Sequence, residues 1–158
     1  MKKNTFEIKP YTDAFKKQVV DVWEKSVRAT HGFLVPSDID HYKKIVAVLD
    51  FNAFSVYCMV REDIVVGFIG VADRKIEMLF LSPEYLGQGL GRTLVNFAIK
   101  ELDADKVDVN EQNLLAVKFY AGFGFEPYGR MEKDSEGKDY PILKMKLSTY
   151  HESIINSS

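Results

Sequence analysis

Residues 85–94 read YLGQGLGRTL, with a glycine at every second position from Gly87 to Gly91. The β-rich run KIEMLFLS at residues 75–82 precedes them, and apolar residues at helical spacing follow from Leu90. Glycine adopts backbone conformations closed to other residues and has no Cβ to hinder an approaching ligand. A strand, a glycine loop and a helix N-terminus together present backbone N–H groups and the positive end of a helix dipole. This segment therefore predicts a phosphate-binding loop, with a tight turn that holds no ligand as the alternative.

Two well-known glycine loops match only in part. A Walker loop requires a lysine before Ser or Thr, whereas Gly91 is followed here by Arg92 and Thr93. A dinucleotide fingerprint requires G-x-G-x-x-G, whereas the spacing here is G-x-G-x-G, although Asp108 lies at a suitable distance downstream. The strands before the loop also have the short links of antiparallel neighbours, whereas a dinucleotide fold normally opens with its motif. An oxidoreductase with a nucleotide cofactor is therefore the weaker alternative.

Periodicity predicts the elements around this segment. Helices are expected from Asp13 to about Gly32 and from Ser37 or Asp38 to about Leu49. The other predicted elements are a first strand at 6–8, antiparallel strands at 54–60, 64–72 and 75–82, a helix at 90–102, a strand at 106–110, a helix at 112–124, and strands near 125–132 and 139–147. Because a helix connects the strands at 75–82 and 106–110, these two should lie parallel. We expect one domain over residues 1–148, with 149–158 as a frayed tail.

Composition narrows the choice of partners. The chain has 158 residues, of which 46% are hydrophobic and 28% charged, and its net charge is −2. No basic block indicates nucleic acid or an anionic membrane as a partner, and no apolar run could span a bilayer. The start, MKKNTFEIKPYTD, has no apolar core of a signal peptide, so we expect a cytoplasmic protein. Cys58 is the only cysteine and the three histidines lack ligand spacing, so no disulfide framework and no metal site are expected.

Two longer stretches indicate a family. The stretch IEMLFLSPEYLGQGLGRTLVNFAI resembles motif A of the GCN5-related N-acetyltransferases, the GNAT superfamily, whose Q/R-x-x-G-x-G/A loop holds acetyl-CoA. The stretch VNEQNLLAVKFYAGFGFE is similar to the family's motif B, N-x-x-A-x-x-F-Y-x-x-x-G-F. VWEKSVRATHGFL and GRMEKDSEGKDYPIL are further similar to the bacterial YjaB-like branch.

The resemblance implies an α/β (α+β) GNAT fold. This fold has a mixed central sheet, here of about six to seven strands with about four flanking helices. The strands at 75–82 and 106–109 should splay apart. The implied activity is direct transfer of acetyl from acetyl-CoA to an amine, through a ternary complex and without a metal. The implied acceptor is a small molecule or a protein. Whether the chain forms a homodimer is left open.

The resemblance also implies the acetyl-CoA site. Backbone N–H groups of the glycine loop should hold the pyrophosphate, and the pantetheine arm should pair with the edge of the strand at 76–82. The implied residues are Leu79, Phe80, Leu81, Leu86, Gly87, Gln88, Gly89, Leu90, Gly91, Arg92, Asn113, Ala116, Phe119 and Tyr120. Leu86 stands where the family has Gln or Arg, so Gln88 or Arg92 is expected to supply the missing donor.

Catalytic roles are implied for two residues. Tyr120 matches the family's tyrosine that protonates the departing thiolate; the alternative is an ordinary core aromatic. Glu77 lies where many relatives carry a glutamate base, acting directly or through water. It shares a strand face with Lys75, and a surface ion pair is the alternative. The thioester oxygen should meet a backbone N–H near Phe80.

The stretch SVRATHGFL carries the expected acceptor site. Arg28, Thr30, His31 and Phe33 are its candidate residues. Arg28 and His31 would favour an acceptor with a carboxylate or phosphate, and His31 is a further candidate base. Alternatively, both residues complement the C-terminal end of a helix. Because Leu86 departs from the motif and the base is undecided, a non-catalytic acyl-CoA sensor is the alternative function.

Overall fold

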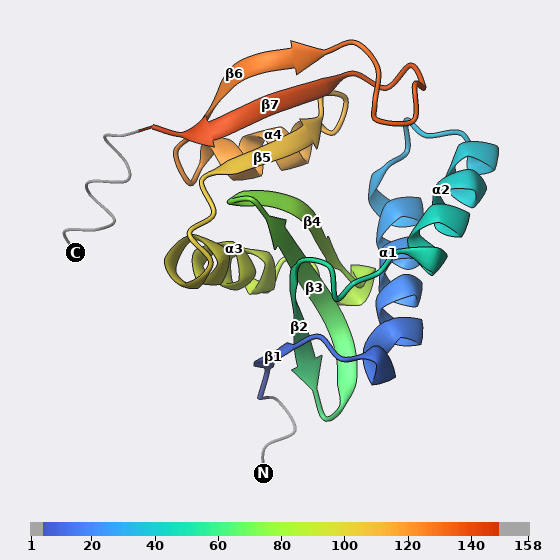
Figure 1. Ribbon diagram of the computed structural model, residues 1–158, viewed down its shortest axis with the longest axis vertical. Helices are drawn as coiled ribbons and strands as arrows, with labels where there is room; N and C mark the ends of the chain where they lie inside the picture. Colours follow the sequence, from blue (N-terminus) through green and yellow to red (C-terminus); the bar gives the residue numbers. More distant parts are fainter. Residues whose placement is uncertain (1–4, 149–158) are drawn as a thin grey trace.

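The computed structural model describes residues 5–148, and its centre is one seven-stranded sheet of order β1-β2-β3-β4-β5-β7-β6 (Figure 1). The strands are β1 (Glu7–Pro10), β2 (Ser55–Arg61), β3 (Ile64–Ala72), β4 (Lys75–Leu81), β5 (Lys106–Asn110), β6 (Phe125–Met131) and β7 (Ile142–Leu147). The helices are α1 (Lys16–Thr30), α2 (Pro36–Val48), α3 (Leu90–Glu101) and α4 (Leu114–Ala121), with short 3-10 turns η1 (Asp13–Phe15) and η2 (Pro83–Tyr85). The mixed sheet and four helices confirm the predicted fold class.

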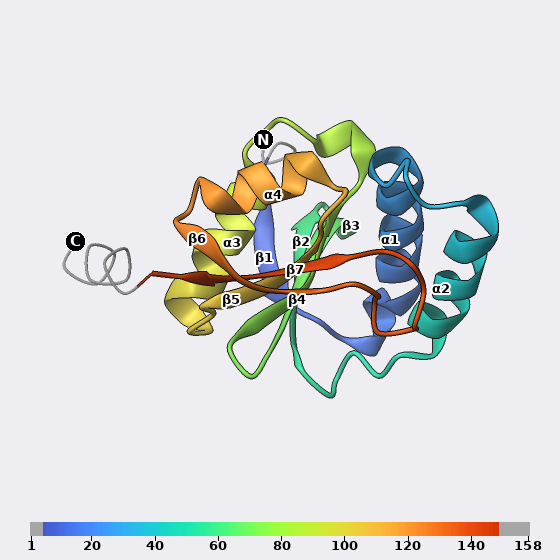
Figure 2. The ribbon, with the colours of Figure 1, turned by 90° about the horizontal axis from the view of Figure 1, so that it is seen from above.

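The sheet has a hydrophobic core on each face. Helices α1 and α2 pack on one face and α3 and α4 on the other, as the view from above shows (Figure 2). The alternation of β3 feeds both cores, because Phe68 packs toward α1 whereas Ile69 packs toward α3. Cys58 is fully buried on the α1 side, and its burial raises the pKa of the thiol to about 12. It is therefore an inert core residue.

Strands β4 and β5 separate soon after they meet. Their parallel pairing consists of Lys75 with Lys106 and Ile76 with Val107, after which β5 continues only against β7. The edge of β4 from Glu77 onward therefore faces no strand, and the expected splay is confirmed. On its other edge, β4 has a bulge, since Ile76 pairs with Val71 and Met78 with Gly70 while Glu77 has no partner in β3. Such a bulge redirects the side chain it carries.

Several element boundaries differ from the sequence prediction. Helix α2 begins at Pro36, not at a Ser37 or Asp38 cap, because the fixed φ of proline suits the first helical position. The predicted N-cap Asp13 instead lies in η1, and its carboxylate accepts a hydrogen bond from Asn52 Nδ2 at 3.0 Å. Strands β1 to β4 are each antiparallel to their neighbours in the sheet. The alternative of a doubly wound dinucleotide-binding fold is therefore wrong. The tail at 149–158 lies outside the described residues.

Gly67 is expected to resist substitution in the stretch of β3 that faces Leu81. A Cβ at Gly67 would lie 2.4 Å from Leu81 Cδ2 and 3.0 Å from the Phe80 carbonyl oxygen. Gly67→Ala should therefore lower the free energy of unfolding by about 1–3 kcal/mol despite the usual gain in chain entropy. Gly32→Ala is the matched control, because a Cβ there meets no atom within 4 Å. Denaturant unfolding of both variants checks this, and equal stabilities would contradict the clash.

Candidate active site

The glycine loop follows η2 and leads into α3. Gly87 and Gly89 have φ of +79° and +82°, and a Cβ at either position would meet no atom within 4 Å. Glycine is therefore required here by backbone conformation and not by crowding. Gly89 is also the N-cap of α3. The N–H groups in the first turn of a helix have no carbonyl one turn earlier, so those of Leu90 to Arg92 remain available to an anion.

Gly91 serves a different purpose from the two glycines before it. A Cβ at this position would lie 3.4 Å from Leu81 Cδ1 and 3.5 Å from the Phe119 ring. Gly91 therefore allows β4, α3 and α4 to meet closely. This contact brings the two predicted motifs together in space, since Leu81 belongs to the first and Phe119 to the second.

The predicted substitutes for Leu86 both contact other parts of the protein. Leu86 itself is 46% exposed. Gln88 Nε2 donates to the Glu84 carbonyl at 3.5 Å, and the Arg92 guanidinium lies 5.1 Å from the centre of the Phe123 ring. An anion at this loop is therefore met first by backbone N–H groups and the α3 dipole. The residues present suit a pyrophosphate, because backbone recognition does not depend on the side chain at position 86.

Helix α4 carries the predicted acid. Tyr120 is 6% exposed, and its ring packs edge-on against Phe119 and Phe125 at centroid distances of 5.2 and 5.7 Å. Burial raises the pKa of Tyr120, so the phenol stays protonated at neutral pH. Asn113 caps the helix, since its side-chain oxygen accepts the Ala116 N–H at 3.2 Å. The motif asparagine therefore shapes the start of α4.

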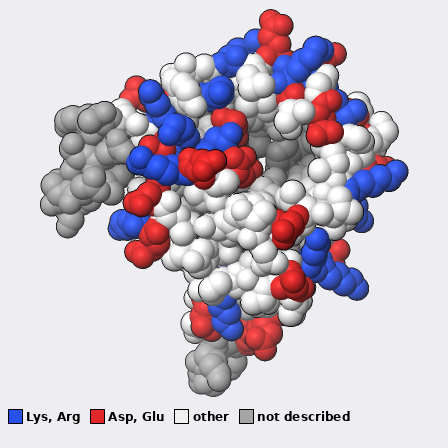
Figure 3. Space-filling view, in the orientation of Figure 1, with Lys and Arg blue, Asp and Glu red and all other residues white. Residues whose placement is uncertain are grey.

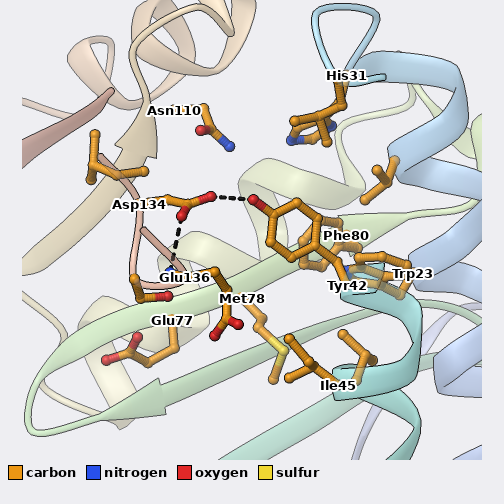
Figure 4. A pocket seen from close by; sticks show the side chains of 15 residues that line it. Trp23, His31, Tyr42, Ile45, Glu77, Met78, Phe80, Asn110, Asp134 and Glu136 are labelled. Atoms are coloured by element: carbon orange, nitrogen blue, oxygen red, sulfur yellow. Dashed lines mark hydrogen bonds between the residues drawn. The ribbon is translucent and has the colours of Figure 1, made fainter. Parts of the chain in front are cut away.

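A cavity of about 310 Å³ opens beside the splayed strands. Its walls come from α1, α2, β4, the end of β5 and the loop between β6 and β7 (Figure 4). The lining residues are Trp23, Val27, His31, Leu34, Tyr42, Ile45, Val46, Glu77, Met78, Phe80, Asn110, Asp134, Ser135, Glu136 and Ile142. Figure 3 shows the hollow in the face turned to the viewer, with acidic side chains at its edge.

Three carboxylates give this cavity a negative character. Glu77 comes from the β4 bulge, and Asp134 and Glu136 come from the β6–β7 loop. Lys75 Nζ lies 3.5 Å from Glu77 Oε2 and 3.0 Å from Asp108 Oδ2, so the predicted surface pair of Lys75 and Glu77 exists. Glu77 nevertheless lines the cavity, with 40% of its side chain exposed. The cavity therefore favours a cation over an anion.

The Tyr42 hydroxyl of α2 holds the acidic loop in place by donating a hydrogen bond to Asp134 Oδ2 (Figure 4). The other oxygen of Asp134 accepts the N–H groups of Glu136 and Lys138, both at 2.9 Å. Burial, followed by the contact with Asp134, raises the pKa of Tyr42. The carboxylate thus shapes its own loop and joins it to α2.

A second set of contacts supports the loop behind the cavity. The Tyr140 hydroxyl donates to Asp38 Oδ2 at 2.6 Å and accepts the Val35 N–H at 3.3 Å. Lys138 Nζ lies 3.0 Å from the other oxygen of Asp38, and these two partners lower the pKa of the Asp38 carboxyl. His41 Nε2 lies 3.3 Å from Glu136 Oε1. The segment around Tyr140 therefore fixes the cavity wall to the start of α2.

The structure brings the expected acceptor residues together only in part. His31 lines the cavity, and its ring centre lies 5.4 Å from that of Phe33. The Thr30 hydroxyl contacts His31 Nδ1 at 2.8 Å. Arg28 does not line the cavity; it pairs on the exposed face of α1 with Glu24 at 3.0 Å and Asp40 at 2.8 Å. Sequence reasoning missed the lining residues Trp23, Tyr42, Met78, Asn110, Asp134 and Glu136, since their local patterns indicated only helix core, strand and turn.

The sequence matches a known protein family and a named relative. Residues 14–149 match the acetyltransferase (GNAT) domain, so the chain belongs to the GNAT acetyltransferase family and is an N-acetyltransferase. It is 34% identical over 129 residues to the peptidyl-lysine N-acetyltransferase YjaB of Salmonella typhimurium. The aligned region covers 82% of this chain and 89% of that protein.

Two solved structures share the fold of this chain. The solution structure of apo YjaB from Escherichia coli is similar with a TM-score of 0.82 and 32% identity, over 90% of this chain and 97% of that one. The PaiA N-acetyltransferase of Thermoplasma acidophilum, solved with coenzyme A, shares the fold with a TM-score of 0.72 at 20% identity, over 90% and 99% of the two chains.

No group of three or more His, Cys, Asp or Glu side chains in residues 5–148 is arranged to hold a metal ion. Within the same range, no helix has the length and apolar character needed to cross a membrane.

The link between Tyr42 and Asp134 should contribute measurably to stability. Tyr42→Phe removes the hydroxyl that donates to a partly buried carboxylate, so the free energy of unfolding should fall by about 1–3 kcal/mol. Tyr128→Phe is the matched control, because Tyr128 is 43% exposed on β6 and its ring contacts with Lys144 and Lys146 survive the change. Thermal and denaturant unfolding compare the two variants. Identical stabilities would mean that the loop is held without this hydrogen bond.

Proposed function

We propose that this N-acetyltransferase acetylates lysine side chains of proteins, with acetyl-CoA as donor, through a direct ternary complex. One observation carries the proposal: a negatively charged cavity with apolar walls lies beside the open edge of β4. Its relative from Salmonella typhimurium is named a peptidyl-lysine N-acetyltransferase, which supports the same acceptor class.

The donor side of the proposal rests on the loop and the splay. The glycine loop and the N-terminus of α3 suit the pyrophosphate, and the unpaired edge of β4 from Glu77 to Leu81 suits an extended arm that pairs like a strand. Phe80 lies on this stretch, so a backbone N–H near it is the proposed donor to the thioester oxygen.

The acceptor side rests on charge and shape. Glu77, Asp134 and Glu136 attract an ammonium group, and apolar walls such as those of Trp23 and Met78 suit the aliphatic stem of lysine. The anionic acceptor expected from Arg28 is not proposed, because Arg28 is paired with Glu24 and Asp40 outside the cavity. A protein lysine is therefore the acceptor of choice.

The chemistry requires one proton acceptor and one proton donor. Bound acetyl-CoA supplies an acetyl thioester, whose C–S bond breaks as the C–N bond forms. Tyr120 is the proposed acid, because its phenol is buried and protonated beside the contact between the two motifs. Glu77 and His31 both line the cavity and are the two candidates for the base.

The remaining expectations are consistent with this proposal. The proposed compartment is the cytoplasm, where reducing conditions keep thiols such as that of Cys58 free. No nucleic acid or membrane partner is proposed. Strand β6 forms an edge of the sheet, and a homodimer through the last strands stays a prediction.

Replacing Tyr120 separates an enzyme from a binding module. Tyr120→Phe keeps the ring that packs on Phe119 and Phe125 and removes only the acidic hydroxyl. We expect kcat on a lysine peptide to fall by about 100-fold or more, with the Kd for acetyl-CoA unchanged. Mass spectrometry of the peptide and calorimetric titration give the two values. Wild-type protein that binds acetyl-CoA but acetylates no amine would support the sensor instead.

The glycine loop can be tested with two glycines of similar conformation. Gly89 and Gly137 have φ of +82° and +75°, so alanine at either position costs a similar backbone strain of about 1–2 kcal/mol. Only Gly89→Ala alters the loop at α3, so only this variant should weaken acetyl-CoA binding, by about 10-fold or more. Calorimetry measures both affinities. Equal losses in the two variants would exclude the loop as the pyrophosphate site.

A further inference from the structure

Backbone hydrogen bonds and ring contacts hold His31 at the cavity. It caps the C-terminus of α1, where its N–H donates to the Val27 carbonyl at 2.9 Å and its carbonyl accepts the Leu34 N–H at 3.0 Å. Its ring lies 5.4 Å from that of Phe33 and 6.4 Å from that of Phe80, centre to centre. Phe80 belongs to the open stretch of β4. The imidazole is thus fixed beside the strand edge proposed for the donor.

Thr30 determines which nitrogen of His31 carries the hydrogen. Its hydroxyl oxygen lies 2.8 Å from the Ser26 carbonyl oxygen and 2.8 Å from His31 Nδ1. The carbonyl can only accept, so the single hydroxyl hydrogen of Thr30 points to Ser26. Nδ1 must therefore carry a hydrogen and donate it to Thr30. The neutral ring then has its lone pair on Nε2.

The surroundings keep this ring neutral. Burial lowers the pKa of His31 below its ordinary value. The titratable groups that share the cavity are Tyr42 from α2, Glu77 from β4, and Asp134 and Glu136 from the β6–β7 loop. Burial is the cause of the lowered pKa of His31, and none of these groups offsets it. Glu77, in contrast, is 40% exposed and lies within 3.5 Å of Lys75 Nζ.

We propose that His31 Nε2 is the general base of the acetyl transfer and that Thr30 is the positioning residue that holds its tautomer. The inference rests on the proposed function and assigns the base within that same site. In Figure 4 the His31 ring is turned toward the cavity that takes the acceptor. Glu77 remains a wall carboxylate that attracts the ammonium group.

The proton balance of the step is complete. The ammonium group of the acceptor first loses one proton to solvent. The resulting neutral amine forms the C–N bond to the acetyl carbon, and Nε2 takes the second N–H proton. The C–S bond breaks, its electron pair stays on sulfur, and the Tyr120 hydroxyl gives its proton to that sulfur. Solvent then carries one proton from the His31 imidazolium to the Tyr120 phenolate. The products are an amide and free CoA thiol.

Kinetics of matched variants test the base. With a lysine peptide as acceptor, His31→Gln should lower kcat by about 100-fold with acetyl-CoA affinity retained. It should also remove the loss of activity that wild-type protein shows as the pH falls through the pKa of His31. His41→Gln is the control, because His41 is the other histidine among residues 5–148 and pairs with Glu136 outside the base position. It should keep the wild-type pH profile.

The role of Thr30 has a readout independent of activity. Imidazole 15N NMR of wild-type protein should show hydrogen on Nδ1 and none on Nε2 of His31. Thr30→Val should mix the tautomers and lower kcat, and Thr30→Ser should restore both. His31→Gln with wild-type kcat, or an Nε2–H tautomer in wild-type protein, would overturn the proposal. Wild-type protein without activity on lysine peptides would instead overturn the proposed acceptor, and the NMR result would still report on Thr30.

Discussion

The site depends on the separation of β4 and β5 after two pairs of residues. Parallel neighbours normally pair along their shared length, because unpaired backbone groups that are buried cost free energy. Here β5 gives all five of its residues to β7, and β4 continues without it to Leu81. The open edge leads directly to η2 and the glycine loop. One change of pairing therefore opens the edge that we propose for an extended ligand arm, and this edge leads to the proposed anion site.

The cationic acceptor that we propose makes opposing demands on the cavity. Carboxylates such as Asp134 and Glu136 attract an ammonium group, but they also stabilise its charged form and so oppose the loss of a proton. A base within the same cavity must be neutral and close to the reacting nitrogen. The burial that lowers the pKa of His31 meets this need, whereas Glu77 belongs to the negative wall itself. The two tasks are thus divided between different side chains.

How much of this could be predicted from sequence depends on how local each feature is. The glycine loop, its strand and its helix are contiguous, so their residue types alone predicted a phosphate-binding loop between a strand and a helix. The cavity proposed for the acceptor joins separate segments, and its link from Tyr42 to Asp134 spans 92 positions. The turn around Asp134 was predictable from its composition, but nothing local shows that its carboxylate reaches α2. Arg28 illustrates the same limit, because its partner Asp40 comes from the next helix.

The two ends of the site carry opposite charges for a chemical reason. The donor is an anion at its phosphate end, and the proposed acceptor is a cation, so one uniformly charged cleft would repel one of them. Backbone N–H groups and the α3 dipole supply the positive end without lysine or arginine at position 86, and Glu77, Asp134 and Glu136 supply the negative end. Tyr120 belongs to the core on the α3 side of the sheet, whereas Phe80 packs against the core on the α1 side. The burial of Tyr120 lowers the local dielectric constant, which strengthens a hydrogen bond from its hydroxyl to a reacting group.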